Sequence, residues 1–368
     1  SCRHREKLQE FGLTTKQVAE FARRVEPRIY TPRSSKGLPM AIASFLDPPD
    51  DIRKMTQEDR ENLLRSLTDA FVERLYYGTR RGKIENERTY LYELIDYAWR
   101  EGIPLKGLDG LANLLRLVEE PPFQQIGGLP VEQYIDAENR RKRLLNKINT
   151  LLTGPERGWF EGKPVEMTDF LYSSRGRVPI NIVNLRELDR FEDRVLVIYH
   201  IASKIRNWMC KQPSSNSPRL LFLIDEIGGG GGKEALFPSY PYESAAKWGL
   251  NYLLRQGRAF GVCSVFATQN PGDVDYKGLS NCGTWMVGKL ATKRDDDKVL
   301  EGMAVMGVEA AKVKRNLTNA GIGEFVIRDP RGDVHFIQTR WLYTYHRVLT
   351  IQEVERICHR TTKGRSPL

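Results

Sequence analysis

The residues LLFLIDEIGGGGGKEA at positions 220–235 decide the fold: they join an apolar run, two acids, five glycines and a lysine. The glycines and lysine invite comparison with a P-loop. A P-loop has a glycine, four residues, a second glycine, a lysine and then Ser or Thr, because backbone N–H groups cradle phosphates and the hydroxyl binds magnesium. With Lys233 in that register, Ile227 replaces the first glycine and Glu234 replaces the hydroxyl. The stretch is therefore not a P-loop.

The apolar run before the glycines predicts a different motif. Residues 220–224 are all apolar, which is typical of a buried parallel strand. That strand would place Asp225 and Glu226 at its carboxyl end. This is the Walker B pattern, in which one acid binds the magnesium shell and the other activates water. The glycine run that follows is interpreted either as a mobile lid near the site or as a plain linker.

Composition restricts the class of protein. The 368 residues can form one large core with an insertion, or two domains. The 57 basic residues outnumber the 47 acidic ones, giving a net charge of +10 that favours a polyanionic partner. The five cysteines show no CxxC spacing, which argues against zinc and for a reducing compartment. No apolar run approaches the roughly 18 residues that span a bilayer, so we expect a cytoplasmic protein without a membrane segment.

Two kinds of sequence pattern follow one another along the chain. Residues 51–157 show helical periodicity, and Thr56 with Asp59 forms a capping-box-like start. After residue 158, β-branched runs alternate with helical stretches, which predicts a parallel sheet flanked by helices. The expected strands are 180–183, 220–224, 262–268, 284–290, 323–328 and 334–338. We therefore expect an α/β core at 158–345 that also includes residues 1–50, an all-helical inserted domain at 51–157, and a C-terminal tail at 346–368.

Several longer stretches carry a resemblance to a known family. They are LLFLIDEI, LLRQGRAFGVCSVFATQNPGDVDYKGLSNCGTWMVGKLATKRD, RIYTPRSSKGLP and EEPPFQQIGGLP. This order of a Walker B strand, a helix ending in RQGRAFG and a strand ending in ATQNP resembles the HerA branch of the HerA/FtsK family of DNA-pumping ATPases. The resemblance implies a RecA-like P-loop NTPase core, a homo-hexameric ring, ATP and Mg²⁺ as cofactors, duplex DNA as the partner, and a nuclease as a further partner.

The resemblance also assigns roles to residues of the core. Asp225 would bind Mg²⁺ and, with Glu226 and Gln269, the nucleotide. Glu226 would be the general base, and Gln269 would sit beside the γ-phosphate. The family's P-loop is missing from these 368 residues. In the family it precedes the RIYTP-like strand, so we expect that the chain is truncated and that this fragment is inactive alone.

The resemblance supports an arginine finger, which enters the site of a neighbouring subunit. Arg255 and Arg258 are three residues apart on one helix, so they share a face. Arg294, with Lys293, competes for the same role. The sequence does not decide among them, and a salt bridge within the subunit is the structural alternative.

Basic runs are the candidates for DNA contact. They are Arg140, Arg141, Lys142 and Arg143, together with Arg80, Arg81 and Lys83. A motor of this kind grips phosphates, so its binding should depend on salt and little on sequence. Two other functions remain open: a non-catalytic ring-forming scaffold without its own nucleotide site, and a basic nucleic-acid-binding module in which the acid pair is incidental.

Overall fold

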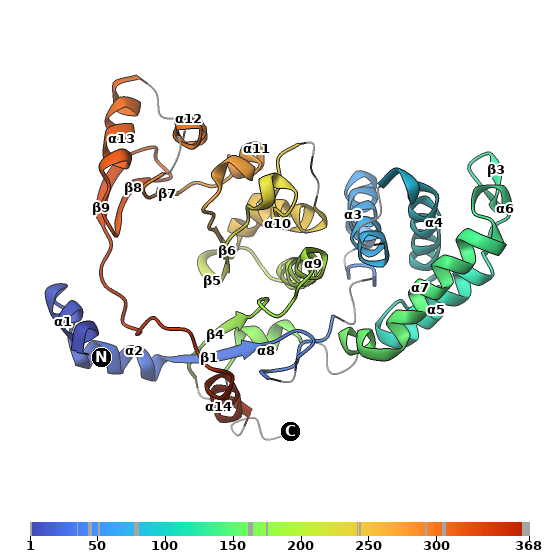
Figure 1. The fold of residues 1–368 in the computed structure, drawn as a ribbon, viewed down its shortest axis with the longest axis horizontal. Helices are drawn as coiled ribbons and strands as arrows, with labels where there is room; N and C mark the ends of the chain where they lie inside the picture. Colours follow the sequence, from blue (N-terminus) through green and yellow to red (C-terminus); the bar gives the residue numbers. More distant parts are fainter. Residues whose placement is uncertain are drawn as a thin grey trace.

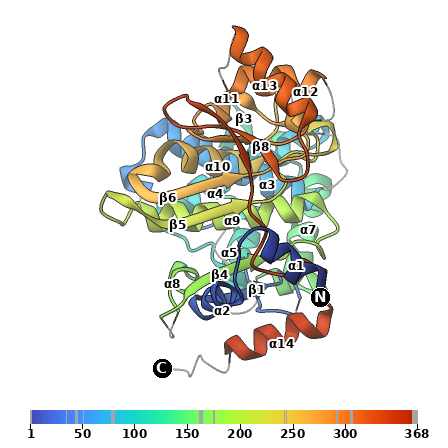
Figure 2. The same ribbon diagram turned by 90° about the vertical axis from the view of Figure 1, so that its left-hand side faces the viewer.

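The structure is a computed structural model. It describes residues 2–34, 36–42, 46–50, 52–76, 81–160, 165–173, 176–240, 242, 244–290, 293–303 and 307–362. The described chain combines helices with parallel strand pairs, which confirms the α/β class (Figures 1 and 2). No described helix is both long enough and apolar enough to cross a bilayer.

Two parallel pairs form the centre of the α/β part. Strand β1 (Val25–Tyr30) pairs with β4 (Val178–Val183), and β5 (Ser215–Ile224) pairs with β6 (Phe260–Phe266). Within the described residues the two pairs are separate sheets, with β5–β6 above β1–β4 in Figure 1. Helix α9 (Phe191–Met209) connects β4 to β5, and α10 (Ala245–Gln256) connects β5 to β6. Among the described residues, the expected single parallel sheet is thus divided into two separate pairs of strands.

The prediction that β5 is a buried strand is wrong. Leu221 and Leu223 are 63% and 56% exposed, whereas Ile224 is 5% exposed. Leu220 and Phe222 pack against the main core, so one face of the strand is covered and the other faces outward. The run of apolar residues therefore indicates a strand correctly but does not reveal which of its faces this chain covers.

The last three strands pair antiparallel, contrary to the expected parallel sheet. Strands β7 (Trp285–Val287), β8 (Glu324–Arg328) and β9 (Val334–Gln338) form their own sheet. Only a short turn joins β8 to β9, whereas a parallel pairing needs a crossover of about a dozen residues. With α12 (Lys293–Gly302) and α13 (Gly307–Asn319), this sheet encloses a small separate core around Met303.

Residues 57–152 are mainly helical. The long helices are α3 (Gln57–Leu75), α4 (Glu85–Glu101), α5 (Gly107–Glu119) and α7 (Lys142–Leu152). Thr56 caps α3 by accepting a 3.1 Å bond from the Asp59 amide, as predicted. The region is not entirely helical, because Gln125–Ile126 and Leu129–Pro130 form a small hairpin, β2–β3. Within the stretch of helical periodicity, residues 131–152 divide into α6 (Val131–Tyr134), a short π-helix (Ala137–Arg141) and α7.

The helical region and the α/β part share one hydrophobic core. Leu64 and Phe71 of α3 belong to the same buried cluster as Ile201 of α9 and Leu250 of α10. The ends of the chain add α1 (Cys2–Glu10), α2 (Thr15–Arg24) and α14 (Ile351–Thr362), while α8 (Met167–Leu171) and α11 (Tyr276–Leu279) are short. Part of the expected C-terminal tail is the helix α14, and it packs on β1 through a 3.4 Å contact from the Cys358 thiol to the Ile29 carbonyl.

Candidate functional site

The acid pair lies where β5 and β6 end together. The parallel register pairs Ile224 with Phe266, so the residues that follow both strands share one edge of the sheet. Asp225 and Glu226 come directly after β5, and Gln269 is the third residue after β6. The structure thus brings together the three residues that the sequence predicts to act with nucleotide and magnesium.

A bulge in the backbone turns Glu226 out of the ladder. The Ala267 amide donates to Ile224 O at 3.0 Å, and Ala267 O accepts from the Ile227 amide at 2.9 Å. Because a regular parallel ladder would use the amide of residue 226 for that second bond, the chain holds one extra residue here. Glu226 has a φ of 65°, a left-handed conformation that is uncommon outside glycine. Such bulges re-aim side chains beside functional sites.

The Glu226 carboxylate points at the end of β6. Its Oε1 accepts a 2.8 Å hydrogen bond from the Thr268 hydroxyl, and its Oε2 accepts a 3.2 Å bond from the Gln269 backbone amide. The Asp225 side chain is exposed, and within the described residues it has no hydrogen-bond or ion-pair partner. One acid is therefore fixed and the other is open to a ligand. The sequence patterns did not single out Thr268, although it is the residue before Gln269 in the ATQNP stretch.

Two amides of the glycine run are already hydrogen-bonded within the loop. The amides of Gly232 and Lys233 donate to the Gly229 and Gly230 carbonyls, so these donors already have partners within the turn. A Cβ added at Gly230 would lie 2.9 Å from Cβ of Glu234, which places that acidic residue against the loop. The loop returns to β5 through a 2.8 Å bond from the Leu236 amide to the Ile227 carbonyl. It is a hydrogen-bonded turn that directly follows the acid pair.

Arg255 and Arg258 lie before the amino-terminal end of β6, whereas the acid pair lies beside its carboxyl end. Arg255 is in the last turn of α10 and Arg258 is in the short helix before β6, whereas Gln269 follows that strand. The seven residues of β6 span roughly 20 Å, so neither arginine reaches Glu226 of its own chain. Both are exposed, and within the described residues neither forms an ion pair. Arg294 starts α12 with Lys293, and the side chains of both lie outside the described residues.

The basic run in the helical region is divided by burial. Arg141 is 7% exposed and pairs with Glu132, and Arg140 pairs with the buried Glu87 at 3.3 Å. These two cations are engaged within the chain. Lys142 and Arg143 are exposed. Lys83 is also exposed, whereas Arg80 and the side chain of Arg81 lie outside the described residues.

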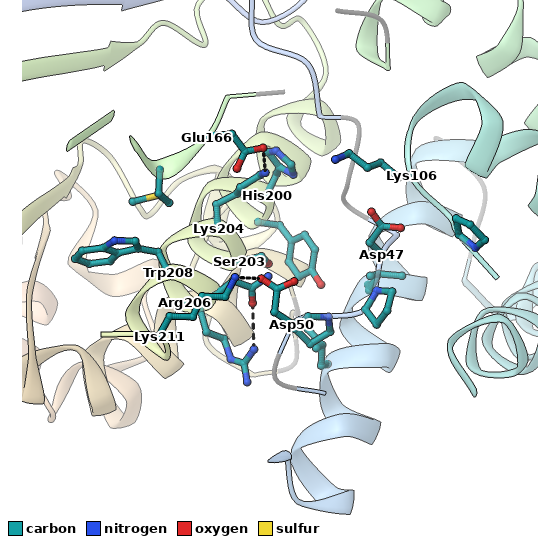
Figure 3. Close-up of a pocket in the computed structure, with 18 of the residues that line it drawn as sticks. Asp47, Asp50, Lys106, Glu166, His200, Ser203, Lys204, Arg206, Trp208 and Lys211 are labelled. Atoms are coloured by element: carbon teal, nitrogen blue, oxygen red, sulfur yellow. Dashed lines mark hydrogen bonds and ion pairs between the residues drawn. The ribbon is translucent and has the colours of Figure 1, made fainter. Parts of the chain in front are cut away.

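A separate cavity of about 660 Å³ lies between the helical region and α9 (Figure 3). Its charges are largely paired: Lys204 bonds to Glu166 at 3.3 Å, and Lys211 bonds to Asp50 at 2.6 Å. His200 lines it, and burial together with the nearby Lys204 lowers the pKa of the imidazole to about 3. No residue of the acid pair, the glycine run or the end of β6 lines this cavity. It is therefore not part of the candidate nucleotide site.

The turn between β8 and β9 gathers three metal-type ligands. Oxygen or nitrogen atoms of Asp329, Asp333 and His335 lie within 4.8 Å of one another. One Asp329 oxygen accepts bonds from the amides of Arg331 and Asp333 at 2.8 and 3.0 Å, which closes the turn. The His335 imidazole lies 3.7 Å from the other Asp329 oxygen. These contacts account for the cluster as part of a hairpin turn.

Comparison with known proteins gives one curated relative and several solved structures of low similarity. No family model matches the chain. A protein of Methanocaldococcus jannaschii, named Probable helicase MJ1565, is 30% identical over 155 residues, which are 41% of this chain and 28% of that protein. The chain thus spans less than a third of the length of the curated relative that it matches.

Two solved structures of the conjugative coupling protein TrwB were found. The unbound monoclinic form is 13% identical with a TM-score of 0.41, over 82% of this chain and 70% of that one. The complex with ADP and Mg²⁺ is 13% identical with a TM-score of 0.43, over 86% and 74%. The match to a probable helicase is consistent with the resemblance seen in the sequence motifs, and this chain resembles the HerA/FtsK family of ATPases.

Proposed function

We propose that this chain is the motor region of an ATP-driven DNA translocase or helicase of HerA type. The observation that carries the proposal is the edge at which β5 and β6 end, where an open carboxylate, a fixed carboxylate and Gln269 lie together. The exposed Arg255 and Arg258, at the amino-terminal end of β6, support a ring. They lie too far from the acid pair of their own chain, so each would act in the site of an adjacent copy. A motor that consumes ATP on duplex DNA would work in the cytoplasm.

The donor atoms at this edge suit a magnesium nucleotide. Mg²⁺ prefers oxygen ligands and keeps several waters, so an exposed carboxylate such as Asp225 fits its hydrated shell. Bound there, the ion would neutralise charge on the phosphates. Glu226 would accept a proton from the attacking water, and Gln269 would lie beside the reacting phosphate. The sequence contains no P-loop pattern, so binding of the phosphates would fall to other groups of the working assembly.

The test is Glu226→Gln in the complete gene product. The amide keeps the size of the side chain but loses the base, so we expect nucleotide affinity to persist and steady-state hydrolysis to fall nearly to zero. Glu234→Gln is the matched control, because Glu234 is an exposed acid of the same loop with no assigned role. Undiminished DNA-stimulated turnover in the Glu226 variant would remove this residue from the site.

A non-catalytic ring-forming scaffold is the second candidate. It is favoured by one observation, namely that the amides of Gly232 and Lys233 in the glycine run are hydrogen-bonded within the loop, in a sequence that does not match the P-loop pattern. Magnesium-dependent nucleotide binding and hydrolysis by the complete gene product would support the motor. Ring assembly without either property would support the scaffold.

A further inference from the structure

Thr268 is the residue that fixes the Glu226 carboxylate. Its hydroxyl donates to Oε1 at 2.8 Å, and the next backbone amide, that of Gln269, donates to Oε2 at 3.2 Å. We propose that Thr268 is a positioning residue, which aims Glu226 at the water that attacks the nucleotide. This inference rests on the function proposed above and adds to it a residue that does not itself touch substrate.

The direction of the hydroxyl proton follows from its other contact. The Thr268 oxygen accepts a 3.0 Å bond from the Asn270 amide. Since the carboxylate of Glu226 can only accept, the hydroxyl proton points towards it. An ionised carboxylate has about four lone-pair sites, and the two donors from β6 leave others for water. The contact therefore orients Glu226 without closing it to a proton.

The backbone of Glu226 requires such a restraint. Its φ of 65° and the bulge at Asp225 and Glu226 are strained features, and strain of this kind persists only when neighbouring groups hold it. A glutamate side chain without a partner would move among several rotamers. Loss of alignment between a base and its reacting group lowers the rate of the chemical step more than it lowers binding.

Gly228 provides the space for the Thr268 hydroxyl. A Cβ at this position would lie 2.7 Å from Thr268 Oγ1 and 2.9 Å from the Asn270 carbonyl oxygen. Gly228 is not among the residues with positive φ, so this glycine is needed for the close approach and not for its backbone conformation. The first glycine of the run thus has a packing role that ties the loop after Glu226 to the end of β6.

The test compares Thr268→Val with Thr268→Ser in the complete gene product. Valine keeps the shape but loses the donor, so we expect kcat for ATP to fall roughly 10- to 100-fold while KM changes little. Serine restores the hydroxyl and should restore most of the rate. Ser264→Ala is the matched control, because Ser264 is also on β6 and its hydroxyl has no hydrogen-bond partner among the described residues.

A stability measurement tests the contact without relying on turnover. If the hydrogen bond exists, the effects of Thr268→Val and Glu226→Ala on stability should be non-additive. The unfolding equilibrium constant of the double variant should then differ at least about threefold from the value expected if the two single effects were independent. Additive effects would show that the contact is absent and would overturn the proposal. Coupling in stability with an unchanged kcat in Thr268→Val would overturn the positioning role alone. No hydrolysis by the wild-type protein would instead refute the proposed function, and with it any positioning role, while leaving the contact established.

Discussion

Replacing Arg74 with Met should weaken the attachment of the helical region to the α/β core. Arg74 lies near the end of α3, and its guanidinium contacts both Glu156 and Asp193 of α9, the latter at 2.8 Å. The side chains of Arg74 and Asp193 are only 5% and 3% exposed. The Trp159 ring lies 5.7 Å from the guanidinium carbon. Methionine would fill most of the same space but remove the charge.

The structure gives the size of this effect. Removing one partner of a buried ion pair typically costs about 3–5 kcal/mol, because the other charge is left unpaired. Glu156 is 26% exposed and keeps Arg33 at 3.6 Å, so most of the loss comes from Asp193. We therefore expect a loss of about 3 kcal/mol in the free energy of unfolding at pH 7.5.

The loss should shrink as the pH falls. Burial raises the pKa of Asp193, while Arg74 opposes that rise, so the pKa should climb further without the arginine. A carboxyl whose pKa is higher in the folded state gains stability as pH falls through that folded pKa, since the native state then binds the proton. The gain is limited to about 1.4 kcal/mol per pH unit.

Urea unfolding at pH 7.5 and 5.5 measures both effects, as a shift in midpoint at constant slope. Arg60→Met is the control, because Arg60 is on the same helix and pairs with Asp96 but is 33% exposed. A partly exposed pair of this kind should be worth less than about 1 kcal/mol. A loss for Arg74→Met no larger than that of the control, or one that grows at pH 5.5, would refute the reasoning.

Three further predictions follow from the sites described above. Arg255→Ala or Arg258→Ala should leave nucleotide binding unchanged and lower ATP hydrolysis by roughly 10³-fold. Rings that mix such a variant with Glu226→Gln subunits should recover part of the hydrolysis. If neither arginine variant recovers hydrolysis in mixed rings, the finger would be assigned to Arg294 or Lys293. The pKa of His200 is about 3 in the folded state against an ordinary value of 6.5. Between these two pH values the unfolded state binds more protons than the folded state. The free energy of unfolding should therefore fall as pH drops below 6.5, by up to about 1.4 kcal/mol per pH unit. His200→Met should remove this dependence in urea unfolding between pH 7 and 5, and an unchanged slope would contradict the assignment. Replacing Lys142 and Arg143 with Ala should weaken duplex binding equally across sequences and reduce the salt slope by about one per residue; an unchanged slope would exclude contact with phosphates.

The sequence by itself determined the strands that carry the candidate site, the acid pair and the neighbourhood of Gln269, but not the hairpin β2–β3. These predictions depend on local patterns: an apolar run predicts a strand, and its last residue fixes where the acids lie. Because β5 and β6 pair in parallel, both strands end at the same edge of the sheet, and the residues after β5 lie beside the residues after β6. The Thr56 cap was predictable for the same reason, since donor and acceptor are three residues apart.

Only the tertiary structure decided how these residues are used. The extra residue at the end of β5, the contact from Thr268 and the space left by Gly228 depend on the approach of two segments about 40 residues apart. Burial of Arg141 and the cavity at His200 likewise depend on which helix faces pack together. Antiparallel pairing of β8 and β9 was available from the short turn between them, but the apolar periodicity of each strand is the same in either direction. A local pattern specifies the type of element, whereas the partner of each face and side chain is set by the packing of the whole chain.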